Sequence, residues 1–203
     1  MPRTEAVNQE IRDQQRLNIL RAALKVFAQM GWQATMADIA KQANISQGLA
    51  YRYFEGKEII FLEILDRVEQ EGHLAYFLQD GNSPKERLRN LITRLLDPGS
   101  VDMAFYQVAM QMFRSKGLPE SLQPRTQDLV MQFREVIKQL IVEGQANKEF
   151  VVGDPEQLTI ATLAMMNGLT LFGLRNQEQI MRHFPDADIV MRILVPWNSN
   201  QKL

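Results

Sequence analysis

The stretch TMADIAKQANISQGLAYRYFEGK, residues 35–57, decides how the N-terminal part of this chain folds. Thr35 and Ser46 are residues suited to cap helix N-termini, and each precedes a short run with helical character. Between these runs stands Asn44, and asparagine tolerates the left-handed backbone conformation better than most residues. The stretch therefore predicts two short helices joined by a tight turn, which is the layout of a helix-turn-helix.

The second predicted helix begins with side chains suited to reading bases. In a helix-turn-helix the first turn of the second helix reaches the base edges of DNA in the major groove. Glutamine can contact adenine through two hydrogen bonds, and leucine can meet the methyl group of thymine, while glycine permits close backbone approach. We expect contacts to bases from Gln47, Gly48, Leu49 and Tyr51, and contacts to phosphates from Thr35, Tyr53 and Lys57. The predicted DNA-contact set is Thr35, Ser46, Gln47, Gly48, Leu49, Tyr51, Arg52, Tyr53 and Lys57.

A generic helical corner in an all-α core is the alternative interpretation of this stretch. Small residues such as Ala40 and Ala43 would let two helices approach in either case. However, an exposed Gln-Gly pair followed by Tyr-x-Tyr-Phe-x-x-Lys is poorly explained by packing alone. The sequence therefore favours DNA binding.

Helical periodicity continues through the rest of the chain, and no run alternates as a strand would. Gly31 is expected to end the first helix. After a break, Ser83 and Glu86 predict a capping box, with Pro84 at the first helical position. The predicted fold class is all-α with about nine helices, at residues 8–30, 35–43, 46–54, 57–79, 84–96, 101–115, 124–144, 155–174 and 186–194.

Composition excludes several classes of protein. The formal net charge is only −1, yet residues 1–57 carry eight Lys or Arg against five Asp or Glu, so the N-terminal part is basic. The absence of cysteine suits a cytoplasmic protein and excludes thiolate metal sites. His73 and His183 are isolated, so we expect no metal site and no cofactor. The uncharged stretch at residues 158–174 is too short and too polar for a membrane span.

Residues 17–65 resemble the DNA-binding domain of the TetR/AcrR family of bacterial transcriptional regulators. The resemblance depends on residues 19–27, Gly31, Thr35, Ile39, Ala40, Ala43, Ile45, Ser46, Tyr51, Tyr53, Phe54 and Lys57. It departs from the family at Asn44, where glycine is usual, and at Ala50 and Arg52. The resemblance implies an all-α homodimer that binds palindromic operator DNA and is released by a small molecule. We therefore expect a helix-turn-helix domain at residues 1–56, and a ligand-binding and dimerisation domain at 57–203 with a connecting helix at 57–79.

The C-terminal part offers two weaker signals. Methionine and phenylalanine side chains are frequent there and could line an adaptable apolar pocket, although ordinary core packing would explain any one of them. The candidate pocket residues are Met103, Phe105, Met110, Phe113, Met131, Phe133, Met165, Met166 and Phe172. Small residues spaced along 158–174 permit close helix approach, either at a dimer interface or inside the core. The candidate interface residues are Ala161, Ala164, Gly168, Phe172, Ile189 and Ile193.

These observations predict a cytoplasmic transcriptional regulator, a repressor that leaves its operator when a small apolar or amphipathic effector binds. The effector would favour a state with different spacing of the two DNA-binding units, and the helix at 57–79 would be the moving part. The second hypothesis is an all-α ligand-binding or scaffold protein that no longer recognises DNA. An enzyme is the weakest hypothesis, because the sequence has no nucleophile elbow, no phosphate-binding glycine loop and no metal-ligand cluster.

Overall fold

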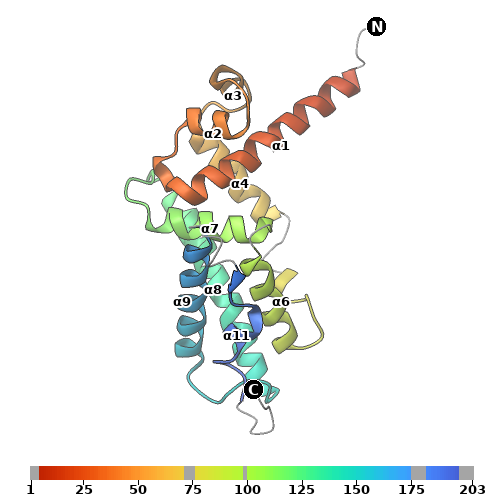
Figure 1. The fold of residues 1–203 in the computed structure, drawn as a ribbon, viewed down its shortest axis with the longest axis vertical. Coiled ribbons are helices and arrows are strands. Elements are labelled where there is room, and N and C mark those ends of the chain that lie inside the picture. The colour runs from red at the N-terminus through yellow and green to blue at the C-terminus, as the bar shows by residue number, and fades with distance from the viewer. Residues whose placement is uncertain (1–4, 71–75, 98–99, 175–181, 197–203) are drawn as a thin grey trace.

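The computed structural model describes residues 5–70, 76–97, 100–174 and 182–196, and within these ranges the protein is all-α. The described part contains nine α-helices and one 3-10 helix, which confirms the predicted fold class. They are α1 (Glu5–Met30), η1 (Gly31–Gln33), α2 (Met36–Gln42), α3 (Gln47–Tyr53), α4 (Lys57–Gln70), α6 (Pro84–Leu96), α7 (Val101–Arg114), α8 (Gln123–Ala146), α9 (Pro155–Leu174) and α11 (Ala187–Met191). Figure 1 shows α1 to α4 gathered at one end of an elongated molecule, which we call the head, and α6 to α11 forming the body below it.

The head packs around three aromatic rings. Phe27 of α1 stacks on Trp32 of η1 at 6.2 Å between ring centroids, and Phe61 of α4 meets both rings edge-on at 5.9 and 6.1 Å. Gly31 ends α1 with a φ of +58°, as the sequence predicts, because glycine adopts this left-handed conformation without steric cost. The apolar face of α4 is buried in the same core. The fourth helix therefore belongs structurally to the head.

The expected capping residues hold α2 and α3 at their N-termini. The Thr35 hydroxyl accepts a hydrogen bond from the amide of Asp38, and the Ser46 hydroxyl accepts one from the amide of Leu49. Asn44 adopts a φ of +55°, so the chain turns at the predicted residue. Ile45 packs into the corner, where its amide donates to the carbonyl of Ala40 at 3.0 Å. The two helices and the turn of the helix-turn-helix are thus confirmed.

The body has a second apolar core, formed by the inner faces of α6, α7, α8, α9 and α11. Ser83 caps α6 as predicted, with Pro84 at the first helical position. The expected capping box is incomplete, because the Glu86 carboxylate accepts from the amide of Asn82 at 2.8 Å instead of from that of Ser83. A capping box needs the amide of the cap residue itself, and here the carboxylate serves the preceding one.

One expected helix is described only in part, and another is shorter than the sequence indicates. The helix expected at 57–79 is described as α4 as far as Gln70, and residues 71–75, including His73, lie outside the described residues. The helix expected at 186–194 is reduced to Ala187–Met191. Pro196 follows closely and biases Val195 away from the helical conformation, while the carbonyl of Leu194 accepts from the amide of Val151 at 2.7 Å.

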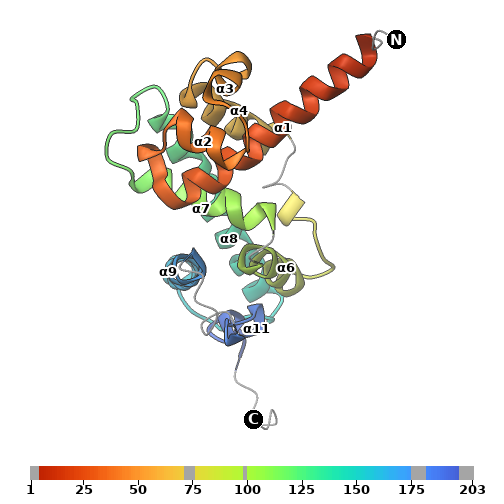
Figure 2. The ribbon, with the colours of Figure 1, turned by 45° about the horizontal axis from the view of Figure 1, so that its top comes forward.

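Helix α7 lies between the two cores (Figures 1 and 2). Val108 and Met112 are buried in the core of the head, and Phe105 packs against it from the same face of the helix. Tyr106 and Met110 turn instead toward the core of the body. The head therefore packs directly on α7. A displacement of α7 would change contacts in both the head and the body. Among the described residues, no helix has the length and apolar character that crossing a membrane requires.

Candidate nucleic-acid interface and ligand pocket

The exposed side of α3 carries the side chains that the sequence predicts for reading bases. Gln47 and Gly48 are exposed in the first turn, and Tyr51 follows one turn later with 49% of its surface accessible. A Cβ atom added at Gly48 would have no neighbour within 4 Å, so this glycine faces open space. On the opposite side of α3, Ala50 is fully buried. The helix thus has one face for the core and one face available to a partner.

Contacts from α1 and α4 hold α3 in place. The Arg16 guanidinium donates to the carbonyl of Tyr53 at 3.0 Å, pairs with the carboxylate of Glu63, and lies 4.2 Å from the centroid of the Phe54 ring. At the other end, the side-chain amide of Asn18 donates to the carbonyl of Ala43 at 3.0 Å, just before the turn. A helix as short as α3 is unstable alone. These contacts supply the rigidity that base reading needs.

Thr35 serves mainly as a cap in this structure. Its amide and its hydroxyl both donate to a carboxylate oxygen of Asp38, at 3.0 and 2.6 Å. These hydrogen bonds from Thr35 lower the pKa of Asp38, so that a negative charge stands at the start of α2. The predicted phosphate contact of Thr35 stays a prediction, and it would have to form beside this carboxylate.

Lys57 is likewise occupied within the head. Its ammonium donates to the carbonyls of Trp32 and Ala34 at 2.7 and 3.0 Å and lies 4.4 Å from the centroid of the Trp32 ring. Burial lowers the pKa of Lys57. An ammonium has three hydrogens to donate, so one remains available for a phosphate. The phosphate contact of Lys57 stays a prediction. Lys57 links α4 to the residues that precede α2.

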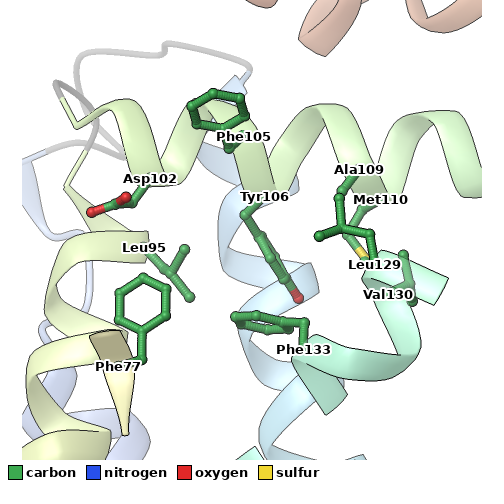
Figure 3. A pocket seen from close by; sticks show the side chains of 10 residues that line it. All are labelled: Phe77, Leu95, Asp102, Phe105, Tyr106, Ala109, Met110, Leu129, Val130 and Phe133. Carbon is green, nitrogen blue, oxygen red and sulfur yellow. The ribbon is translucent and has the colours of Figure 1, made fainter. Parts of the chain in front are cut away.

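An apolar cavity of about 60 Å³ lies in the body between α6, α7 and α8. Figure 3 shows Tyr106 pointing from α7 toward Phe133 of α8, with ring centroids 5.1 Å apart. Phe105 leaves α7 in the opposite direction, toward the head. Leu129 also lines the cavity and packs against the core of the head. The wall of the pocket is therefore shared with the head.

Three of the nine candidate pocket residues line this cavity, namely Phe105, Met110 and Phe133. Met103 and Met166 are buried elsewhere in the body, and Met165 packs at the edge of its core. Phe113, Met131 and Phe172 are about half exposed, at 49%, 53% and 53%. The cavity does not include these six residues, because residue type predicts an apolar environment but not which face of a helix is turned inward.

The polar groups of the pocket were not predicted from the sequence. The Tyr106 hydroxyl donates to the side-chain oxygen of Asn167 on α9 at 2.8 Å, and burial raises the pKa of Tyr106, so this hydroxyl stays neutral. Asp102 is the charged residue among those lining the cavity, and its carboxylate lies 3.7 Å from the guanidinium of Arg94. Neither residue carries a sequence signal, since both occur in an ordinary helical pattern.

The outer face of α9 is apolar and exposed. Ala161 and Ala164 lie on it with Gly168, where an added Cβ would meet nothing within 4 Å, and Phe172 continues the stripe toward the C-terminal end. In Figure 1 this helix runs along one side of the body. Ile189 of α11 is 43% exposed, whereas Ile193 packs against the body core. The predicted interface residues of α9 thus share one face, and Ile193 does not join them.

No cluster of three potential metal ligands occurs among the described residues, where His183 is exposed at the surface.

Comparison with known proteins identifies both parts of the chain. Residues 19–64 match the model of the bacterial regulatory proteins of the tetR family, and residues 81–172 match the tetracyclin repressor-like C-terminal domain. The HTH-type transcriptional regulator HbdR of Aromatoleum sp. (strain CIB) is 37% identical over 81 residues, which are 37% of this chain and 34% of that protein. The uncharacterised HTH-type regulator YuxN of Bacillus subtilis (strain 168) is 34% identical over 82 residues, which are 39% of this chain and 28% of that protein. The chain therefore spans about a third or less of the length of these relatives.

A solved structure supports the fold over most of the chain. A transcriptional regulator from Saccharomonospora viridis, in complex with choline, superposes with a TM-score of 0.65 at 22% identity. The superposition covers 91% of this chain and 100% of that one.

Proposed function

The chain belongs to the tetR family of bacterial transcriptional regulators, and we propose that it is a homodimeric repressor that binds a palindromic operator and leaves it when a small effector binds. Its DNA-binding helix-turn-helix domain is assigned to residues 1–56, which lie in the head, and the remainder, which begins with α4, binds ligand and partner subunit. The family is one of regulators, and we propose no catalytic activity and no cofactor. Because its partner is DNA, the protein would act in the cytoplasm.

The main observation that supports DNA binding is the geometry of α3. This helix is capped and held by neighbouring helices, and Gln47, Gly48 and Tyr51 lie on its exposed face. In a dimer the two recognition helices would lie about 34–36 Å apart and read successive major grooves. Fluorescence anisotropy with the DNA upstream of the protein's own gene tests this. Gln47→Ala and Tyr51→Ala should weaken operator binding strongly, since a good base contact contributes about 1–3 kcal/mol of discrimination.

Gln127→Ala is the matched control, because Gln127 is an exposed glutamine on α8, in the body. It should bind the operator as the wild type does. If the wild type binds no DNA while a small molecule still stabilises it, the protein is a ligand-binding protein without DNA recognition. A reporter gene under the same operator then tests the direction of regulation, which we expect to be repression.

The exposed apolar face of α9 supports the homodimer. Ile160 and Leu171 are 58% and 48% exposed on this helix, beside the small residues Ala164 and Gly168. Small residues let helices of two subunits approach closely, and most soluble oligomers are symmetric dimers. Gly168→Ala should leave the subunit folded, because its added methyl meets open space, but should weaken the dimer. Sedimentation velocity over a concentration series measures this, and an unchanged dimer would contradict the assignment.

The apolar cavity supports a small, mostly apolar effector. Typical ligand pockets measure roughly 300–1,000 Å³, far more than the 60 Å³ present here, so an effector must push the cavity walls apart. Phe105 and Leu129 would carry that movement to the head, because both line the cavity and pack against the head core. The Asp102 carboxylate would favour a positively charged end over a negative one, with the surrounding aromatic rings providing cation–π contacts.

Thermal unfolding with two probes of similar size tests the charge preference. Benzyltrimethylammonium should raise the melting temperature more than phenylpropionate does, and Asp102→Asn should remove the difference. A preference for the carboxylate probe would contradict this part of the proposal, while operator release by either probe would still support the effector-binding function.

A further inference from the structure

Helix α1 extends beyond the core of the head. Residues 7–14 of this helix are exposed, whereas the face buried in the core begins at Ile19. Figures 1 and 2 show its N-terminal part projecting at the same end of the molecule as α3, on the side away from the body. The projecting half of α1 therefore adds surface beside α3 and adds little to the core.

A polar groove separates this projecting half from α3. The hollow measures about 490 Å³ and is lined from α1 by Gln9, Arg12, Asp13 and Arg16. From α3 it is lined by Leu49, Arg52 and Tyr53, three residues of the predicted DNA-contact set. The groove is thus continuous with the face of α3 that is proposed to meet DNA, and it adds side chains that lie outside that set.

Positive charge predominates in the groove. Arg16 is neutralised by Glu63, which fixes it against the end of α3. Among the described residues none forms an ion pair or a hydrogen bond with the side chain of Arg12 or Arg52, and both are exposed. Asp13 is the opposing charge, and its carboxylate accepts from the side-chain amide of Gln9 at 3.0 Å. Two available guanidinium groups therefore face one carboxylate.

We propose that this groove binds the sugar-phosphate backbone of duplex DNA beside the major groove that α3 enters, with Arg12 and Arg52 contacting phosphates. The inference rests on the proposed DNA-binding function and extends the interface to α1. Guanidinium groups suit this task because their planar donors match phosphate oxygens in pairs. Arg16 acts as a positioning residue that holds α1 against α3. Contacts of this kind fix the position of a protein on DNA without reading its sequence.

Salt dependence of binding distinguishes a phosphate contact from a base contact. Each lost phosphate contact reduces the slope of log affinity against log salt by about 0.9, and at about 0.1 M salt it lowers affinity on the order of tenfold. Arg12→Gln should show both effects on the operator and, to the same extent, on unrelated duplex DNA. Asp13→Asn should bind more tightly than the wild type, since it removes a negative charge while keeping the acceptor for Gln9.

Lys25→Gln is the matched control, because Lys25 is an exposed cation on the same helix but outside the groove. It should bind nearly as the wild type does, and all three variants should melt at the temperature of the wild type. If Arg12→Gln keeps the wild-type affinity and slope, or if Lys25→Gln loses as much, the groove is not a phosphate site. With either of these two results, DNA binding by the wild type would leave the proposed function intact. A wild type that binds no DNA would overturn the proposed function and the phosphate site together.

Discussion

The head and the body are both built from packed helices, but they use aromatic residues differently. In the head, Phe27, Trp32 and Phe61 pack against one another and fill the core. In the body, Tyr106 and Phe133 lie beside a cavity. A filled core holds its surface in one geometry, while a core with a cavity can rearrange around a ligand. The comparison indicates a rigid part suited to recognition and an adaptable part suited to sensing.

The two cores meet at α7, which contributes one face to each. Residues 105, 108 and 112 recur at helical spacing on the side of the head, and residues 106 and 110 on the side of the body. Both regions therefore depend on one helix, and we expect them to unfold together.

The largest effect should come from emptying the core of the head. Phe27→Ala removes a fully buried ring and should lower the free energy of unfolding by about 3–5 kcal/mol. Denaturant unfolding followed by circular dichroism measures this loss, with Phe113→Ala as the control because Phe113 is 49% exposed and lies outside the proposed dimer face. Since α7 joins the cores, a single transition is expected. Two separate transitions, with the head unfolding first, would show that the regions are independent.

A smaller effect is expected from overfilling the core of the body. At Gly144 an added Cβ would lie 2.2 Å from the Phe150 ring, so Gly144→Ala forces a displacement that should cost about 1–3 kcal/mol. Gly153→Ala is the matched substitution, because its Cβ would only reach ordinary contact with Leu158 at 3.7 Å. Thermal melts of the two variants should differ clearly. Equal stability would mean that the body yields at Gly144 more easily than its packing suggests.

The link between the regions is tested by Phe105→Ala. Phe105 lines the pocket, and its ring packs against the head core. Removing this ring should therefore reduce the coupling between effector and operator by about 0.5–2 kcal/mol. The measurement is the ratio of operator affinities without and with a probe that stabilises the wild type. Met110→Ala, on the body side of α7, should weaken probe binding but leave the ratio at saturation unchanged. If Phe105→Ala keeps the affinity ratio of the wild type, the coupling between effector and operator does not pass through Phe105.

The smallest effect concerns the surface pair of Arg89 on α6 and Asp188 on α11, whose charged atoms lie 2.7 Å apart. Hydrogen bonds from Arg89 lower the pKa of Asp188 below its ordinary value of 3.8. A carboxyl whose pKa is lowered by folding stabilises the folded protein at any pH above the pKa of the unfolded chain. This stabilisation is lost as the pH falls through the pKa of the folded protein. Because the pair is exposed, it should contribute at most about 0.2–1 kcal/mol.

Asp188→Asn should therefore lower stability slightly at neutral pH and make no difference in acid, below the folded-state pKa. Unfolding free energies at the two pH values measure this, with Asp128→Asn as a control for an exposed carboxylate on α8. A loss of stability in Asp188→Asn that persists in acid would indicate that the side chain acts by packing instead of by charge.

The sequence predicted local features of this protein, such as helix caps and turns, better than it predicted which distant segments come into contact. The caps Thr35 and Ser46, the turn at Asn44 and the helix end at Gly31 follow from backbone chemistry within a few residues, and all four are confirmed. The pocket was predicted less well, because a run of methionines and phenylalanines indicates burial without saying which helices meet. Phe77, Leu95 and Tyr106 line the cavity through contacts between distant segments, and no local signal marks them.

The sequence by itself determined that the chain is helical, where its DNA-reading helix begins, and which face of that helix is free. These properties depend on hydrogen bonds and apolar spacing over a few helical turns. Only the tertiary structure decided that Lys57 is engaged with Trp32, that Arg12 lies across a groove from Arg52, and that α7 divides its side chains between two cores. Such pairings join residues far apart in the chain, and their geometry is set by how whole helices pack.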